Sequence, residues 1–342
     1  MSAEKPAWPG QTKATHVVKD FRFGSGETLP ELKLGYFTLG TPRRDANGDI
    51  ANACLLIHNT TGTAASWLGP GLGGELFAAG QPLDASRWYI VMPDMIGFGG
   101  SSKPSDGMRA AFPHFRYADM VEATHRLLTE ALGIASPRLV LGVSMGGMLT
   151  WMWGERFPDP RTALVPIASQ PGPMSGRNWI QRRVSIEAIR NDPDWNGGNY
   201  EKQPTRYVRT APYSGLLIQS VVKLQQLAPT REAGDRLYQQ LVERARAGDA
   251  NDRLYQLEAS MDYDPSAGLE KIQGPLLSIN FADDELNPVE LGVMEPAIAR
   301  ISAARYVLIP AGPATNGHAT SGLPAVWKPP LAEFLAGLPV PS

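Results

Sequence analysis

The stretch that decides the fold is residues 138–157, RLVLGVSMGGMLTWMWGERF. It begins with an apolar, branched run from Leu139 to Val143, which predicts a short buried strand. A Gly-x-Ser-x-Gly sequence follows, with Ser144 at its centre, and a helix pattern rich in Met and Trp begins at Gly147. A strand, a serine and a helix in this order predict the sharp turn that presents a nucleophilic serine.

Steric crowding explains the two glycines of this motif. A serine on so sharp a turn takes a strained backbone conformation, and only small residues two positions away avoid a clash. Gly142 and Gly146 stand at those two positions. The pattern therefore favours a nucleophile over an incidental serine in a glycine-rich turn.

Composition excludes several classes of function. The 342 residues are 43% hydrophobic and carry a formal net charge of −2 without long basic runs, which argues against a nucleic-acid partner. The single cysteine, Cys54, lies in an apolar run and predicts a buried thiol. No apolar run approaches the ~20 residues that span a bilayer, and the N-terminus lacks a signal-peptide core. We therefore expect a cytoplasmic protein without a membrane partner, and no metal or cofactor motif is present.

Strand and helix patterns alternate along the first half of the chain. Stretches 15–23 and 31–40 alternate apolar with polar residues and predict an antiparallel pair at a sheet edge. Further strands are expected at 52–58, 88–94 and 162–169, with a helix over 117–132. This alternation predicts an α/β fold, with a mostly parallel central sheet between helices.

The pattern changes between Gln170 and about Pro265. Strand signals almost vanish there, and helix-compatible stretches appear at 177–190, 216–227, 231–247 and 250–261. Strand patterns return at 274–281 and 305–310, and a helix over 324–337 closes the chain. We predict a core domain formed by residues 1–170 and 266–342, with a helical cap, or lid, inserted over 171–265.

A serine hydroxyl needs a base within hydrogen-bond reach, and the base needs an orienting acid. For a serine on this kind of turn, the acid and then the histidine follow it in the sequence. Of the five histidines, His318 alone follows the last predicted strand, in a loop of small residues. We predict His318 as the general base, His16 and His125 as structural, and His58 as a brace for its own turn.

Three carboxylates compete for the role of the acid in the loop after strand 274–281, ADDELNP. Asp284 is favoured because Pro288, four positions on, begins the next helix and leaves Asp284 in the loop that faces the site. Asp283 is the second choice and Glu285 the third.

The negative charge that forms on the substrate oxygen needs preorganised backbone N–H donors. One donor should be Met145, the residue after the serine. The other should come from the turn after strand 52–58, where Thr60 and Thr61 are the candidates and Thr60 is preferred.

With these residues identified, the chain resembles the α/β-hydrolase superfamily and, within it, the homoserine O-acetyltransferase-like group. The similar stretches are LKLGYFTLGTP, HNTTG, LVLGVSMGGMLTWMWGERFPD, the cap segments 176–200 and 249–264, and the loops ADDELNP and NGH. The resemblance implies an α/β-hydrolase fold with helices on both faces of the sheet. It also implies a triad of Ser144, Asp284 and His318, and a homodimer formed through the cap.

The chain departs from these acetyltransferases in its charged residues. The group usually follows the catalytic histidine with an aspartate that holds the ammonium of homoserine, and this chain has Ala319 there. The group also carries a Tyr-Arg-Ser segment whose arginine serves the acceptor's carboxylate, whereas the corresponding 221–230 has no arginine. The loop MIGFGGSSKPS is nearer to that of ordinary ester hydrolases.

A zwitterion left without its charged partners is poorly held. We therefore expect a serine esterase that cleaves short-chain, above all acetyl, esters of a small molecule with a more apolar alcohol side, without a cofactor. The alternative is a homoserine O-acetyltransferase that uses acetyl-CoA. A binding protein on the same fold, and cleavage of an amide or a carbon–carbon bond, are further alternatives.

Overall fold

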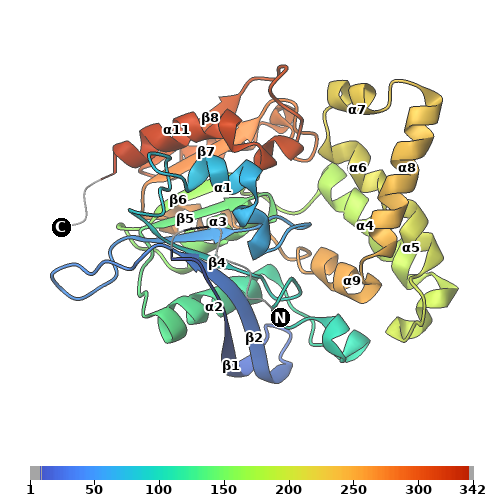
Figure 1. Cartoon of the computed structure of the whole chain (residues 1–342), viewed down its shortest axis with the longest axis horizontal. Helices are drawn as coiled ribbons and strands as arrows, with labels where there is room; N and C mark the ends of the chain where they lie inside the picture. The colour runs from blue at the N-terminus through green and yellow to red at the C-terminus, as the bar shows by residue number, and fades with distance from the viewer. Residues whose placement is uncertain (1–7, 9, 339–342) are drawn as a thin grey trace.

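The computed structural model describes residue 8 and residues 10–338, which form an eight-stranded sheet with helices around it (Figure 1). The strands are β1 (Thr12–Arg22), β2 (Thr28–Leu39), β3 (Ala53–Ile57), β4 (Tyr89–Pro93), β5 (Leu139–Val143), β6 (Ala163–Ile167), β7 (Leu276–Phe281) and β8 (Ala304–Ile309). Their order in the sheet is β1-β2-β4-β3-β5-β6-β7-β8. β2 pairs antiparallel with β1 and β4, and every other pair is parallel, which confirms the predicted mostly parallel sheet.

Helices cover both faces of the sheet because its central strands are buried on both sides. Adjacent strand residues point to opposite faces, so Leu55 belongs to one hydrophobic core and Leu56 to the other. The first core includes side chains of α2 (Tyr117–Arg126), α3 (Met145–Arg156) and α10 (Met294–Ile298). The second includes side chains of α1 (Pro70–Leu76) and α11 (Pro324–Ala336).

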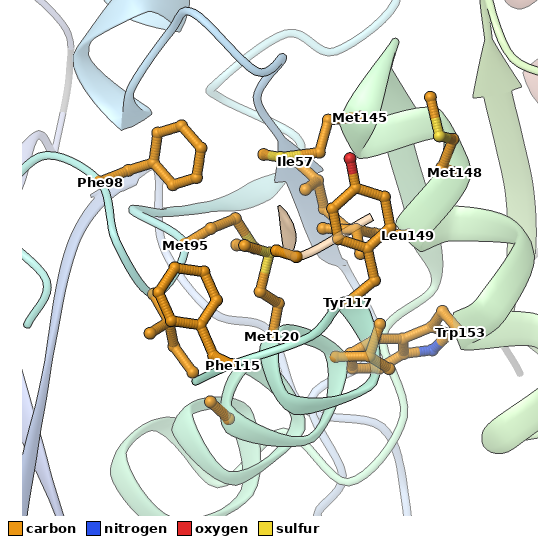
Figure 2. Close-up of a cluster of buried hydrophobic side chains, with 14 of the residues drawn as sticks. Ile57, Met95, Phe98, Phe115, Tyr117, Met120, Met145, Met148, Leu149 and Trp153 are labelled. Carbon is orange, nitrogen blue, oxygen red and sulfur yellow. The ribbon is translucent and has the colours of Figure 1, made fainter. Parts of the chain in front are cut away.

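The first core lies beneath the turn that carries Ser144. Figure 2 shows Met145 and Leu149 of α3 in one cluster with Ile57 of β3 and Met120 of α2. Each of these four side chains is at most 1% exposed. The start of α3 is therefore anchored by tight packing, which fixes the direction in which the turn presents its serine.

Between β6 and β7 the described chain forms helices and no strand. These helices are α4 (Gly176–Arg190), α5 (Thr205–Thr210), α6 (Pro212–Ile218), α7 (Val221–Leu227), α8 (Arg231–Arg246) and α9 (Ala250–Glu258), with short 3-10 turns at Pro193–Gly198 and Ser266–Lys271. In Figure 1, α4 to α8 form a block beside the sheet, and α9 lies between this block and the core. A helical insertion was predicted here, and the division of the chain into two domains stays a prediction.

The helix predicted over 216–227 is instead two helices. The backbone is extended at Gln219, and the Ser220 side chain accepts a hydrogen bond from the Lys223 N–H, so that α7 begins anew with its own cap. The short helices α1 and α5 were not predicted. The helix expected to begin at Pro288 is a 3-10 turn at Val289–Leu291, and α10 begins only at Met294.

None of the helices in the described part of the chain has the length and apolar character needed to cross a membrane. Residues 1–7, on which the expectation of no signal peptide partly depends, lie outside the described residues.

Candidate active site

Ser144 sits between β5 and α3 with φ 56° and ψ −116°, a strained conformation for a residue other than glycine. Its N–H donates to the carbonyl of Ile167 at 2.9 Å. A Cβ atom at Gly142 would lie 2.0 Å from the carbonyl oxygen of Gly146, and one at Gly146 would lie 2.1 Å from that of Ile57. Glycine alone fits at both positions, as the motif predicts.

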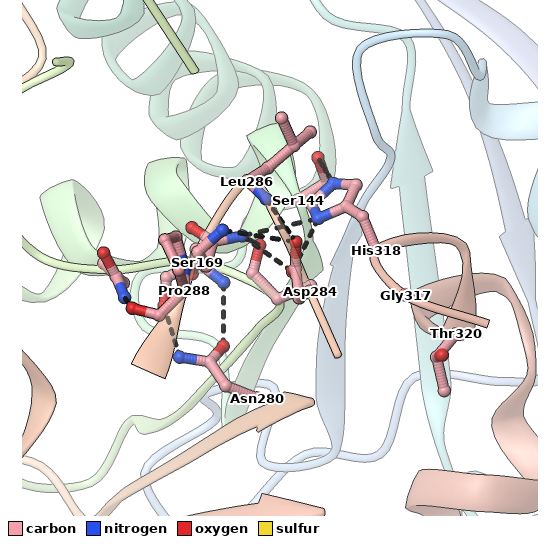
Figure 3. A network of polar contacts seen from close by, with 12 residues as sticks. Ser144, Ser169, Asn280, Asp284, Leu286, Pro288, Gly317, His318 and Thr320 are labelled. Carbon is pink, nitrogen blue, oxygen red and sulfur yellow. Dashed lines mark hydrogen bonds and ion pairs between the residues drawn. The ribbon is translucent and has the colours of Figure 1, made fainter. Parts of the chain in front are cut away.

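The three residues predicted as a triad meet at the carboxyl ends of the strands (Figure 3). His318 Nε2 lies 2.7 Å from Ser144 Oγ, and His318 Nδ1 lies 2.8 Å from Asp284 Oδ2. All three side chains are buried. Because Nδ1 faces a carboxylate, it carries the ring proton, and Nε2 is left to accept the proton of the serine.

Asp284 is held as an anion although it is buried. Burial alone would raise its pKa, but the attraction to His318 and the hydrogen bonds from His318, Asn287 and the Leu286 N–H outweigh burial, so that the pKa of Asp284 lies below its ordinary value. The backbone N–H of Leu286 donates to Oδ1 at 2.8 Å. A fixed negative charge therefore faces the histidine.

Asn287 is a positioning residue that the sequence analysis did not select. Its Nδ2 donates to Asp284 Oδ2 at 2.9 Å and to the carbonyl of Ala168 at 3.0 Å, and so links the acid to the end of β6. A side-chain amide three residues after the acid, in a loop that must satisfy a buried carboxylate, is the signal that could have identified it.

Asp283, the second choice for the acid, braces the histidine loop instead. Its Oδ2 accepts hydrogen bonds from Thr315 Oγ1 and from the Gly317 N–H, each at 2.9 Å. Asp284 alone of the three carboxylates contacts His318. The geometry therefore favours Asp284 over Asp283, and the role of Asp284 as the acid stays a prediction.

The helices between β6 and β7 contact both loops of the triad. Arg177 of α4 pairs with Glu285, the third carboxylate, at 2.6 Å. The Ser220 N–H at the start of α7 donates to Asn316 Oδ1 at 3.3 Å, two residues before the histidine. These contacts connect the acid loop and the histidine loop to the helical insertion.

In the turn after β3, the N–H groups of the two candidates Thr60 and Thr61 differ. The Thr61 N–H donates to Asn59 Oδ1 at 3.1 Å, whereas the Thr60 N–H has no acceptor among the described residues. Met145 is the first residue of α3, a position whose N–H has no partner within the helix. The geometry therefore favours Met145 and Thr60 as the oxyanion donors.

His58 braces this turn, as predicted. The Met95 N–H donates to His58 Nε2 at 3.1 Å, so Nδ1 carries the proton and donates to the carbonyl of Asn59 at 2.8 Å. Burial lowers the pKa of His58, which keeps the ring neutral. The side chain orders the donor turn and is removed from the proton transfer.

The other predicted structural residues lie outside the site. His125 stacks on Phe157, with ring centroids 3.9 Å apart, and His16 lies 3.4 Å from Glu130. Cys54 is fully buried in β3, and burial raises the pKa of its thiol well above the ordinary value. Within the described residues, no group of His, Cys, Asp and Glu side chains is arranged to hold a metal ion.

A cavity of about 230 Å³ adjoins the serine, and we call it the serine pocket. Its lining combines the reacting groups with polar residues of the helical insertion: Asn59, Thr60, Thr61, Ser144, Asn178, Gln181, Arg182, Ser214, Ile218, Arg253, Leu257, Leu286, His318, Ala319, Ser321 and Gly322. Two arginines and no acidic residue are among them. The expectation of a more apolar alcohol side is therefore wrong, because Arg182 and Arg253 reach the pocket from segments other than 221–230.

A second, larger cavity of about 1320 Å³ lies on the side of the acid loop, and Asn178 and Leu286 line both cavities. Its other lining residues include Arg177, Glu285 and Val221.

A serine on a strand–helix turn, with a hydrogen-bonded histidine and aspartate behind it, is the arrangement of side chains found in enzymes of the α/β-hydrolase fold. The chain belongs to the alpha/beta hydrolase fold family, whose model matches residues 55–312.

Comparison with curated proteins finds acyltransferases. A homoserine O-acetyltransferase of Geotalea daltonii is 35% identical over 209 residues, which cover 57% of this chain and 55% of the relative. One of Methanohalobium evestigatum is 30% identical over 81% of this chain and 63% of the relative. A probable acyltransferase of Methanothermobacter thermautotrophicus is 27% identical over 85% and 88%. The chain thus spans less than two thirds of the length of the first two relatives.

Solved structures with the same fold include both kinds of enzyme. An acetylester hydrolase from Corynebacterium glutamicum superposes with a TM-score of 0.81 at 23% identity, over 95% of this chain and 96% of that one. A homoserine O-acetyltransferase from Bacillus anthracis superposes with a TM-score of 0.80 at 20% identity, over 95% and 97%. At these identities the likeness shows the fold alone, whereas the names of the curated relatives favour the acetyltransferase alternative over the ester hydrolase.

Proposed function

We propose that this protein cleaves short-chain acyl esters of small molecules through an acyl-enzyme on Ser144, with water as the final acceptor. The observation that carries the proposal is the chain of hydrogen bonds from Ser144 through His318 to Asp284, beside a pocket that opens onto the serine. No step of this chemistry requires a metal or an organic cofactor.

The first half of the reaction forms the acyl-enzyme. His318 Nε2, 2.7 Å from Ser144 Oγ, takes the hydroxyl proton as the oxygen attacks the ester carbonyl. Asp284 stabilises the imidazolium that forms and holds the ring in orientation. The N–H groups of Met145 and Thr60 donate to the oxyanion, and His318 then passes its proton to the leaving alcohol.

The second half releases the acyl group. Water takes the place of the alcohol, and His318 accepts a proton from it as it attacks the acyl carbonyl. The same donors hold the second oxyanion, and collapse of this intermediate returns the proton to Ser144 Oγ. The products are a short-chain carboxylic acid and the free enzyme.

The choice of water rests on the lining of the serine pocket. A transferase must hold its acceptor firmly enough to compete with water at molar concentration. The ammonium of homoserine would find no carboxylate among the described residues that line this pocket, where Ala319 follows the histidine. An ammonium moved into such a site without a partner is poorly bound.

A second candidate function is the transfer of an acetyl group from acetyl-CoA to homoserine. The names of the curated relatives favour it. The two functions share the acyl-enzyme and differ in the acceptor, so one assay separates them.

The test compares acetate esters with acetyl-CoA in the presence and absence of L-homoserine. We expect steady hydrolysis of acetate esters, a fall of about a thousandfold or more in kcat for Ser144→Ala, and CoA release that does not depend on homoserine. Release of CoA that requires homoserine, with formation of O-acetylhomoserine, would replace the hydrolase with the transferase.

A further inference from the structure

The serine pocket carries positive charge that the triad does not use. Arg182 of α4 and Arg253 of α9 both line it, because α4 packs against α9. No aspartate or glutamate of the described chain lines the same pocket. Two guanidinium groups that share a pocket without a counter-charge repel each other, and an anion between them would remove that cost.

Arg182 has unused hydrogen-bonding capacity. Its side chain is buried, with 4% of the residue exposed, and Nε donates to Asn178 Oδ1 at 3.2 Å. Its Nη1 is buried and has no partner among the described residues. A buried donor left unpaired is costly, so a ligand that accepts from Nη1 would be favoured.

Other arginines of the same helix find acidic partners. Arg183 is about half exposed and pairs with Glu187 at 2.5 Å, and Arg190 pairs with Glu258 at 2.5 Å. Arg182 lies on the face that turns to the pocket and makes no ion pair within the described chain. The charge of Arg182 therefore faces the pocket without an acidic partner from the described chain, whereas the charges of Arg183 and Arg190 are each paired with a glutamate.

Arg253 places the second guanidinium next to the reacting centre. Its Nη1 lies 3.4 Å from the carbonyl oxygen of Thr60, the residue whose N–H is proposed to hold the oxyanion. Burial lowers the pKa of Arg253, and the like charge of Arg182 lowers it further against an opposing effect of Tyr207. A guanidinium nevertheless stays charged near neutral pH.

We propose that Arg182 and Arg253 bind a carboxylate of the substrate, so that the preferred substrate is the short-chain acyl ester of a small hydroxy acid without an ammonium group. The inference rests on the proposed ester cleavage and deepens it. Because the proposed acyl group is short and uncharged, the carboxylate belongs to the alcohol part. The arginine fork matches the two oxygens of a carboxylate, and the cavity of about 230 Å³ suits a small molecule.

Four matched acetate esters test the charge. 4-Acetoxybutyrate carries the carboxylate, 4-acetoxybutyramide replaces it with a neutral amide, O-acetyl-L-homoserine adds an ammonium, and 2-acetoxyethyl phosphate carries a phosphate. We expect kcat/KM for 4-acetoxybutyrate to exceed that of its amide by about tenfold or more, mainly through KM, and to exceed that of O-acetyl-L-homoserine. Equal values of kcat/KM for the acid and the amide would overturn the proposal. A higher kcat/KM for the phosphate would overturn the assignment of a carboxylate as the bound anion.

Variants assign the preference to the two side chains. In Arg253→Gln and, separately, Arg182→Gln, the ratio of kcat/KM for the acid to kcat/KM for the amide should fall toward one, mainly through a rise in KM for the acid. Arg253→Lys should restore part of the ratio. Arg183→Gln, a change of the adjacent exposed arginine, is the matched control and should keep the full ratio. A ratio unchanged in both pocket variants overturns the proposal.

A binding measurement separates this inference from the proposed function. In Ser144→Ala, calorimetry should show that 4-acetoxybutyrate binds more tightly than its amide. Adding Arg253→Gln should abolish this difference in affinity. If wild type hydrolyses none of the esters, the proposed function fails, and this measurement still decides on the anion site. If wild type hydrolyses all esters alike and binding shows no difference, ester cleavage stands and the anion site is overturned.

Discussion

Ser144 takes a backbone conformation that it would not adopt by itself, and its neighbours keep it there. Positive φ at a non-glycine residue costs about 1–3 kcal/mol and persists where the surrounding structure imposes it. Here the strand before it, the helix after it and the two close glycines impose it. The strain directs Oγ toward His318.

Replacing Gly146 tests this steric account. Gly146→Ala should lower the free energy of unfolding by about 3 kcal/mol or more, because its Cβ would lie 2.1 Å from the carbonyl oxygen of Ile57. Thermal and denaturant unfolding measure the loss. Gly71→Ala is the control, because nothing lies within 4 Å of its Cβ in α1, and it should be neutral or slightly stabilising. Equal effects of the two changes would contradict the account.

Two neighbouring carboxylates have different tasks, and exchange of each for an amide separates them. Asp284→Asn should lower kcat by about a thousandfold or more, because an amide neither holds the reactive tautomer of His318 nor stabilises its cation. Asp283→Asn should lower kcat less than about tenfold, because the amide oxygen still accepts from Thr315 and Gly317. Steady-state kinetics with an acetate ester measure both. Comparable losses would show that the two acids are not distinguished in this way.

At the scale of elements, prediction succeeded where burial leaves a strong pattern. The strands β3 to β7 are buried on both faces, so they are continuous apolar runs in the sequence. Short helices leave a weak pattern. α1 reads PGLGGEL, whose three glycines disfavour a helix, and it forms because tertiary packing buries Leu76 in the core beside α11.

The side chain of Asp252 joins α9 to the segment after β4, and its carboxyl group is costly to ionise because it is largely buried. Asp252 accepts hydrogen bonds from the Ser105 N–H at 2.8 Å and from its Oγ at 2.6 Å. Burial raises the pKa of Asp252 to about 6. The folded state therefore holds the proton more tightly than the unfolded state, and the free energy of unfolding falls as pH rises from about 4 to about 6.

Asp252→Asn removes this pH dependence. Relative to wild type, the variant should gain about 1 kcal/mol of stability between pH 4 and pH 7, a value reduced for partial solvent screening. Urea unfolding at several pH values measures the difference. Asp235→Asn, a change of an exposed residue on α8, is the control and should follow wild type throughout. A constant difference between Asp252→Asn and wild type across this range would contradict the prediction.

At the scale of the whole molecule, the helical insertion is also the surface on which the resemblance predicts a homodimer. Leu216 of α6 and Val221, Val222 and Leu227 of α7 are exposed, an unusual gathering of apolar side chains at a surface. We expect light scattering to give about twice the chain mass of 37.0 kDa. Val221→Asp combined with Val222→Asp should give a folded monomer.

Met108→Asp is the control for the added charge, since Met108 is an exposed apolar residue in the chain before α2 and should leave the dimer intact. A wild-type mass of one chain at micromolar concentration would contradict the predicted dimer.

The sequence by itself determined the alternation of elements, the place of the helical insertion, and the serine and histidine that meet in the site. These features depend on local patterns: apolar periodicity, glycines beside a strained turn, and the order of residues along the chain. The tertiary structure alone decided that Asn287 links the acid to the end of β6 and that Arg182 and Arg253 line one pocket. Each of these features depends on which groups from distant segments share a hydrogen bond or a cavity. Tertiary packing determines those contacts, and the residues adjacent in the sequence do not.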